Sequence, residues 1–132
     1  KVKKFDGGLL TFDYGYIQDT GNDTLQSVSK HRYANIFEKL GNADITSHIN
    51  FKLFSEILKK NDLDVRQIVT QSEFLQKMGI MERANILSKK MSFRAKADMY
   101  YRLKKLMHNK EMGSLFKVLF AQKKREKFSL GF

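Results

Sequence analysis

The stretch Gly7–Tyr16, GGLLTFDYGY, decides how the rest of the chain is interpreted. Its apolar part, residues 9–12, is a nearly continuous run rather than a strict alternation, which is typical of a strand covered on both faces. The run ends in a carboxylate, a phenol and a glycine: Asp13, Tyr14 and Gly15. Ligands in open α/β sheets bind at the carboxyl ends of strands. The stretch therefore predicts a site at a sheet edge or, with equal weight, an aspartate that caps a turn.

The segments that follow predict an α/β order of elements. Residues 17–48 show no strong period and have the composition of a long loop. Apolar periodicity predicts a helix over about 51–60, capped by Asn50, and further helices over about 72–107, the first of them opened by a capping box of Thr70 and Glu73. Together with the first strand, 8–16, two further strands are expected, over about 64–69 and 114–121.

Composition narrows the function class. The chain has 132 residues, of which 42% are hydrophobic and none is cysteine, so a single folded domain without thiol chemistry is expected. The formal net charge is +11, and residues 89–132 hold 13 basic and only 3 acidic side chains. Such a basic segment favours an alternative function, a non-enzymatic module that binds nucleic acid or an acidic protein partner. Lysine-rich composition bias accounts for the same charge without any function.

Two polar clusters lie within the predicted loop, on either side of its middle: Asp23-Thr24-Leu25-Gln26 and Asp44-Ile45-Thr46-Ser47-His48. Asp44 and His48 stand four residues apart, so in a helix the carboxylate could orient the imidazole as a base. Turn and cap chemistry is the stronger explanation, above all for Thr46 and Ser47, which lie just before a predicted helix. His31 and His108 have no partners at metal-ligand spacing, so no metal is assigned. The chain contains no glycine-rich nucleotide loop and no nucleophile elbow.

Five blocks in order carry a family resemblance: GGLLTFDYGY, DTLQSVSKH, ADITSHINF, TQSEFLQKMGIMERA and MGSLFKVLF. With these blocks the chain resembles the MidA-like methyltransferases, class I enzymes that use S-adenosylmethionine. It departs from the family pattern at Leu40-Gly41-Asn42, where a Pro-Gly is usual, and at Ser72, where a Gly is usual. Members of the family are much longer, and their glycine-rich loop and ribose-binding acid precede the region matched here.

The resemblance implies the C-terminal portion of a Rossmann-like class I sheet. Its three strands would be the fifth, sixth and seventh, with the helical insertion before the last strand, which runs antiparallel between the other two. Residues 1–132 would then be the C-terminal part of one methyltransferase domain, without the N-terminal half that binds the cofactor. Mitochondrial members assist the assembly of respiratory complex I by methylating a protein arginine.

For function, the resemblance implies the substrate side of a protein arginine methyltransferase that is inactive alone. The candidate substrate-side residues are Asp13, Tyr14, Gly15, Asp23, Thr24, Gln26, Asp44 and His48; no catalytic residue is assigned. S-adenosylmethionine would serve the full-length enzyme, and this chain alone is expected to bind no cofactor. The expected partners are an arginine-bearing protein, the missing half and a second copy at an open strand edge, rather than nucleic acid or a membrane. The expected location is the bacterial cytoplasm, or the mitochondrial matrix in a eukaryote.

Overall fold

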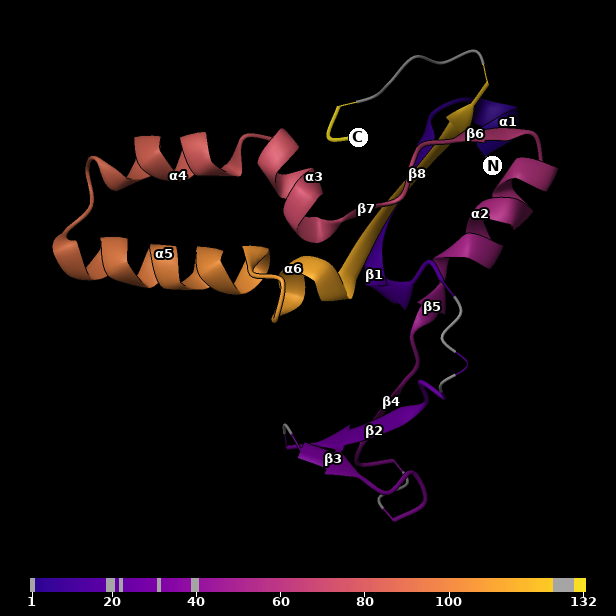
Figure 1. Ribbon diagram of the computed structural model, residues 1–132, viewed down its shortest axis with the longest axis horizontal. Coiled ribbons are helices and arrows are strands. Elements are labelled where there is room, and N and C mark those ends of the chain that lie inside the picture. The colour runs from indigo at the N-terminus through magenta and orange to yellow at the C-terminus, as the bar shows by residue number, and fades with distance from the viewer. Residues whose placement is uncertain (1, 19–20, 22, 31, 39–40, 125–129) are drawn as a thin grey trace.

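The computed structural model describes residues 2–18, 21, 23–30, 32–38, 41–124 and 130–132. Strands and helices are mixed along the chain, which confirms the predicted α/β class. Figure 1 shows a long main sheet, a small separate sheet and a two-helix arm. In chain order the elements are α1 (Val2–Phe5), β1 (Gly8–Tyr16), β2 (Gln26–Ser29), β3 (Arg32–Ala34), β4 (Asp44–Thr46), β5 (Ile49–Asn50), α2 (Phe51–Lys60), β6 (Leu63–Val65), β7 (Val69–Thr70), α3 (Gln71–Lys77), α4 (Ile80–Ser88), α5 (Phe93–Met107), α6 (Met112–Leu115) and β8 (Phe116–Lys123).

Strand β8 is the centre of the main sheet. It runs antiparallel to β1 on one side and to β6 and β7 on the other, and the strand order is β5-β1-β8-β6. The ladder with β1 extends from Gly8 opposite Gln122 to Tyr14 opposite Phe116. The antiparallel last strand thus lies between the two strands that the sequence predicted as its neighbours. The predicted class I arrangement of these strands is confirmed.

The strand predicted over 64–69 is wrong as a single element, because the structure has two short strands there. Val65 lies opposite Ala121 and Val69 lies opposite Val118. Val69 is four residues after Val65, but its partner on β8 is only three residues from the partner of Val65. The segment from β6 to β7 therefore has one extra residue, which forms a bulge. The bulge interrupts the strand while both halves remain paired with β8.

The strand predicted over 114–121 begins later, at Phe116, and continues to Lys123. A short helix, α6, occupies residues 112–115 instead. Gly113 makes this turn possible, because its amide donates to the carbonyl of His108 at 3.1 Å and a Cβ on Gly113 would lie 2.2 Å from the carbonyl oxygen of Met107. The sequence pattern extended the strand across this turn because Leu115 continues the apolar run.

The loop predicted over 17–48 is also corrected. Part of it, strands β2, β3 and β4, forms a small antiparallel sheet in the order β3-β2-β4 (Figure 1). The strands hold only three or four residues each, and β2 is the polar sequence QSVS. Segments this short carry too few residues to show the alternation that marks a strand.

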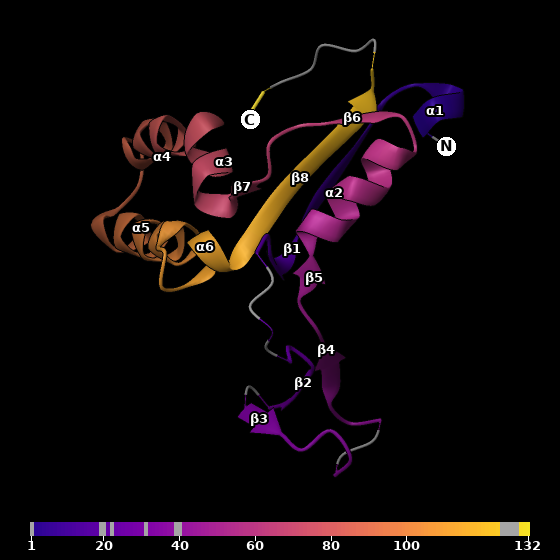
Figure 2. The same cartoon turned by 45° about the vertical axis from the view of Figure 1, so that its right-hand side comes forward.

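Helix α2 covers one face of the main sheet (Figure 2). Its predicted bounds are confirmed, and so is its cap: the side chain of Asn50 accepts a hydrogen bond from the amide of Leu53 at 3.0 Å. The helix buries Phe51 completely against Leu119 and other side chains of the sheet. This cluster is the larger part of the hydrophobic core.

The opposite face of the main sheet is covered by α3 and by the C-terminal residue. Phe74 of α3 packs with Val69 and Val118, and its ring meets that of Phe12 edge to face at a centroid distance of 5.0 Å. Phe132 stacks on the same cluster, with its ring centroid 5.3 Å from that of Phe74. Both faces of β8 are therefore covered, whereas Leu10 and Phe12 on β1 are exposed, so the prediction that β1 is covered on both faces is wrong.

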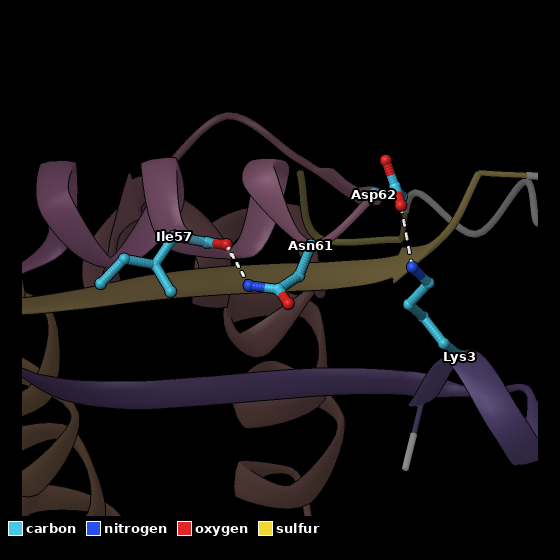
Figure 3. A network of polar contacts seen from close by, with 4 residues as sticks. All are labelled: Lys3, Ile57, Asn61 and Asp62. Carbon is cyan, nitrogen blue, oxygen red and sulfur yellow. Dashed lines mark hydrogen bonds and ion pairs between the residues drawn. The ribbon is translucent and has the colours of Figure 1, made fainter.

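One ion pair attaches α1 to the residue that follows the C-cap of α2, and a second polar contact closes the end of α2 itself (Figure 3). Lys3 donates to the Asp62 carboxylate at 2.8 Å, and the side chain of Asn61 donates to the carbonyl of Ile57 at 2.8 Å. The hydrogen bond from Lys3 is the main cause that lowers the pKa of the Asp62 carboxyl. Because both partners are more than half exposed, water screens this ion pair and its contribution to stability is small.

The capping box predicted at the start of α3 is confirmed. The Thr70 hydroxyl accepts from the amide of Glu73 at 3.2 Å, and the Glu73 carboxylate accepts from the amide of Thr70 at 2.7 Å. The hydrogen bond from the Thr70 amide is the largest cause that lowers the pKa of Glu73. The box fixes the direction in which the chain leaves β7 and enters α3.

We predict that Thr70→Ala lowers the free energy of unfolding by about 1 kcal/mol at neutral pH, the usual cost of losing an N-cap. Because Glu73 has a lowered pKa in the folded chain, its stabilisation is present above its unfolded pKa and is lost as the pH falls through its folded pKa. The difference between wild type and variant should therefore narrow in acid. Urea unfolding followed by circular dichroism at neutral and acidic pH measures both quantities. Ser47→Ala removes an exposed hydroxyl as the control, and an equal loss in both variants would contradict the prediction.

Candidate functional site

The carboxyl end of β1 is held by a short parallel ladder with β5. Gly15 lies opposite Ile49, and Tyr16 lies opposite Asn50. A Cβ on Gly15 would lie 2.3 Å from the carbonyl oxygen of Ile49 and 2.6 Å from the ring of Phe51. Only glycine allows the two chains to approach this closely, so Gly15 has a backbone role and contributes no functional group.

This ladder places Tyr14 beside two other rings. Its ring centroid lies 4.7 Å from that of Phe116 and 6.2 Å from that of His48. His48 is held in place by its backbone, because its amide donates to the hydroxyl of Thr24 at 3.1 Å. An imidazole and a phenol therefore meet at the carboxyl end of β1, where the sequence predicted a site.

The small sheet supplies the opposite wall. Val28 lies opposite both Tyr33 and Asp44, and Gln26 lies opposite Thr46. Directly opposed residues of antiparallel strands project from the same face, so these side chains share one face of the small sheet. The face carries a phenol, a carboxylate, an amide and a hydroxyl within a short reach of one another.

The two walls enclose a cavity of about 380 Å³, here called the aromatic cavity. Three rings line it together with one carboxylate, and its mouth is open, since Tyr33 is 81% exposed and Asp44 is also exposed. Its lining residues are Tyr14, Gln26, Val28, Tyr33, Asp44, Thr46, His48 and Leu115. An open cavity with aromatic walls and one carboxylate has the chemistry to receive a flat organic cation.

The structure brings together four of the candidate residues predicted from the sequence. These four line the aromatic cavity: Tyr14, Gln26, Asp44 and His48. The helical pairing considered for Asp44 and His48 is wrong, because β4 and β5 are extended there. The two side chains reach one cavity through the small sheet instead.

The other candidates have local roles in the fold. Thr24 orients the backbone of His48, and the Asp23 carboxylate accepts from the amide of Leu25 at 2.9 Å, which is turn chemistry. Asp13 accepts from the amide of Tyr14 at 2.8 Å and projects from the opposite face of β1. There it lies across from Lys117, whose pKa is lowered by burial.

Sequence reasoning missed three lining residues, Val28, Tyr33 and Leu115, and it named Thr46 only within a polar cluster and not as a candidate. The first two become apparent only when QSVS, RYA and DIT are paired as three strands, because each segment alone is too short to show its alternation. Leu115 joins them because α6 turns the chain toward the cavity. Within the part of the chain that the structure describes, no group of three metal-ligating side chains gathers, and none of the helices is long and apolar enough to cross a membrane.

Comparison with known proteins identifies the family. A family model described as "Putative S-adenosyl-L-methionine-dependent methyltransferase" matches residues 1–69, more than half of the chain. The chain belongs to this methyltransferase family. The resemblance carried by the five sequence blocks is confirmed, and S-adenosylmethionine is the methyl donor for which the family is described.

Two curated relatives match the sequence of this methyltransferase family member over most of its length. Protein arginine methyltransferase NDUFAF7, mitochondrial, from Xenopus tropicalis is 29% identical over 118 residues. The protein of the same name from Danio rerio is 26% identical over 116 residues. The matches cover 89% and 88% of this chain but only 27% of each relative. The chain therefore spans about a quarter of the length of these relatives.

Two solved structures from Burkholderia thailandensis share the fold. An uncharacterized protein in its native form superposes with a TM-score of 0.83 at 24% identity, covering 95% of this chain and 35% of that one. A second structure, with S-adenosyl-homocysteine bound, has a TM-score of 0.79 at 26% identity, covering 96% and 34%. The fold of this part of the methyltransferase family is thus the fold of the present chain.

Proposed function

We propose that this chain is the C-terminal, substrate-side part of a protein methyltransferase that acts on arginine side chains. Its family, the activity for which its curated relatives are named and the small share of their length that it spans support the proposal. We expect this chain alone to bind no S-adenosylmethionine, because among the described residues the next element after β1 is the strand β2 and not a helix. We place the activity in the bacterial cytoplasm, or in the mitochondrial matrix of a eukaryote.

The aromatic cavity is the observation that carries the substrate assignment. A guanidinium is planar and cationic, so it stacks on the rings of Tyr14 and Tyr33 while the Asp44 carboxylate accepts its N–H groups. In that position a carboxylate can bind two guanidinium N–H groups and leave the third nitrogen free to accept a methyl group. When bound to the complete enzyme, S-adenosylmethionine supplies the methyl group. The residues of this chain supply orientation and charge.

The free edge of β1 supports the proposal that a cofactor-binding half completes the sheet. Of the residues that the structure describes, Gly8–Tyr14 pair with β8 and with no other strand. Leu10 and Phe12 on this strand are 49% and 41% exposed. An open apolar edge attracts another strand, and without the N-terminal half we expect it to attract a second copy of this chain.

Co-expression with an N-terminal half tests the function. The half is taken from an adjacent reading frame or from the Burkholderia thailandensis relative. The complex is given S-adenosylmethionine with a labelled methyl group and a cell extract of the source organism, and the labelled amino acid is identified after hydrolysis. We expect labelled methylarginine from the complex, and neither labelling nor measurable cofactor binding from this chain alone. Labelled methyllysine, or cofactor binding by the isolated chain in calorimetry, would contradict the proposal.

Asp44→Asn in that complex tests the site. We expect turnover to fall about 10- to 100-fold, because a charge-assisted pair contributes about 1.5–3 kcal/mol. The dissociation constant of the cofactor should stay within about twofold, because Asp44 lies on the substrate side. Asp23→Asn is the matched control, since that carboxylate accepts only from the amide of Leu25 among the described contacts. Equal activity of the Asp44 variant and the wild type would refute the site and leave the family assignment intact.

A further inference from the structure

Helices α4 and α5 form a two-helix arm, residues 80–107, that projects away from the main sheet (Figures 1 and 2). A groove of about 290 Å³ runs between the two helices. Its apolar lining repeats at intervals of four and three residues on each helix, which is the spacing of a helix face that receives another helix. These lining residues are Ile80, Ala84 and Leu87 on α4, and Met99, Leu103 and Leu106 on α5.

The groove lacks a third helix among the described residues. Its floor is buried, with Ala84 5% and Leu103 8% exposed, whereas Leu87 on its wall is 45% exposed. Because Ala84 at the bottom of the groove is small and Leu87 beside it is longer, the groove has room for an inserted side chain. Two helices with an apolar face between them are completed most simply by a third helix laid into the groove.

The positive charge of the arm determines which kind of helix can bind in the groove. Residues 80–107 contain eight Lys or Arg and two Asp or Glu. Arg83 and Arg102 line the groove itself. Arg102 pairs with Asp98 at 2.9 Å on an exposed surface, and no ion pair joins Arg83 to a carboxylate of the described residues. A second copy of the arm would bring like charges together, which disfavours self-association through this face.

We propose that the groove of the arm binds an amphipathic helix of a partner protein whose apolar stripe is bordered by Asp and Glu. The apolar stripe would fill the space beside Leu87 and Ala84, and the acidic border would meet Arg83 and Arg102. The rings of the arm do not favour a nucleic acid in its place, because Tyr100 donates to Asn85 at 2.8 Å and Lys105 covers the Tyr101 ring at 4.9 Å. The inference concerns a surface outside the aromatic cavity and does not depend on methyl transfer.

Fluorescence anisotropy with two designed peptides tests the proposal on the whole chain. Both are 18-residue helical peptides with the same leucine stripe, bordered by Glu in one and by Lys in the other. We expect the Glu peptide to bind at least about tenfold more tightly, with an affinity that falls as salt rises. Equal affinity for the two peptides, or binding of neither, would overturn the proposal.

Matched variants locate the binding. Leu87→Ala should lower the affinity for the Glu peptide about tenfold. Ile86 lies outside the groove on the same helix and is 66% exposed, so Ile86→Ala should leave this affinity unchanged. Arg83→Glu should lower the affinity for the Glu peptide about five- to tenfold and raise the affinity for the Lys peptide. Arg94→Glu, outside the groove, should change neither affinity by more than about twofold.

Two further measurements test other occupants of the groove. Light scattering would assign the groove to a second copy of the chain if it detects a dimer that Leu87→Ala abolishes. Sedimentation with anionic vesicles would assign the groove to a membrane if Leu87→Ala abolishes vesicle binding, and either result would overturn the proposal.

Discussion

Phe51→Ala is expected to leave the chain only marginally folded at room temperature. The Phe51 ring is completely buried at the start of α2, between that helix and the central strand, where it contacts the cluster of Leu63, Leu119 and Ala121. Truncating a buried phenylalanine costs about 3–5 kcal/mol, since the cavity left behind adds to the lost burial. The total stability of a small domain is about 5–15 kcal/mol, and a chain with an open strand edge lies at the lower end of that range.

The control is another phenylalanine in a helix of the same chain. Phe93 at the start of α5 is 90% exposed, so Phe93→Ala should change the free energy of unfolding by less than about 0.5 kcal/mol. Circular dichroism and urea unfolding of both variants measure the two effects. If Phe51→Ala unfolds at the same urea concentration as Phe93→Ala, the position of the core described above is wrong.

Gly15→Ala is expected to have the second largest effect, because it displaces the chain at the site. The added methyl group would have to move the carbonyl of Ile49 or the ring of Phe51, and neither is the end of a flexible side chain. Overpacking costs about 1–3 kcal/mol, and separating the two-residue ladder to β5 adds about 1 kcal/mol for each hydrogen bond lost. We expect a total loss of about 2–4 kcal/mol and faster amide exchange in β5.

Urea unfolding and hydrogen exchange followed by nuclear magnetic resonance test this second prediction. Gly7→Ala is the matched control: Gly7 has a positive φ of 100°, and no atom lies within 4 Å of the position of its Cβ. That control variant should show backbone strain of about 1–3 kcal/mol without a change in exchange at Ile49 or Asn50. Unchanged exchange in the Gly15 variant would show that the ladder does not need a glycine.

Local signals made much of the fold predictable from the sequence. Asn50 and Thr70 each carry an acceptor to the start of a helix, and both caps form as predicted. Ser92 caps α5 in the same way, with its hydroxyl accepting from the amide of Ala95 at 3.4 Å. Each of these signals depends on residues three positions apart, so the neighbouring sequence contains all the information needed.

The parts that the sequence did not predict depend on pairing between distant residues. The strand break after Val65 follows from the register on β8, and no pattern within residues 63–70 encodes that register. The small sheet pairs Val28 with Asp44 across a long interval, and its turn uses Lys30 in the left-handed conformation rather than a glycine. A hairpin without a glycine or asparagine turn is difficult to recognise from the sequence alone.

The candidate site, like the fold, was predictable where local sequence signals mark its residues and not where strand pairing brings them in. Among the residues that line the aromatic cavity, Tyr14 was predicted because it ends a recognisable strand, and Gln26, Asp44 and His48 because they lie in polar clusters. Tyr33 was missed because it reaches the aromatic cavity only through its pairing with Val28. Asp13 was favoured by its place at the strand end, yet alternation along β1 directs it to the other face.

The central position of β8 has a consequence for how the chain folds during synthesis. Every strand that pairs with β8 precedes it in the sequence, and the ladder joins Gly8 to Gln122. On the ribosome, β1, β6 and β7 are made before the strand that holds them together, so their apolar faces stay exposed until residues 116–123 leave the exit tunnel. Contacts between residues so distant along the chain form slowly, and exposed strands aggregate while they wait. The nascent chain should therefore depend on a chaperone until its last strand emerges, and the helices α2 and α5 should form first because their contacts are local.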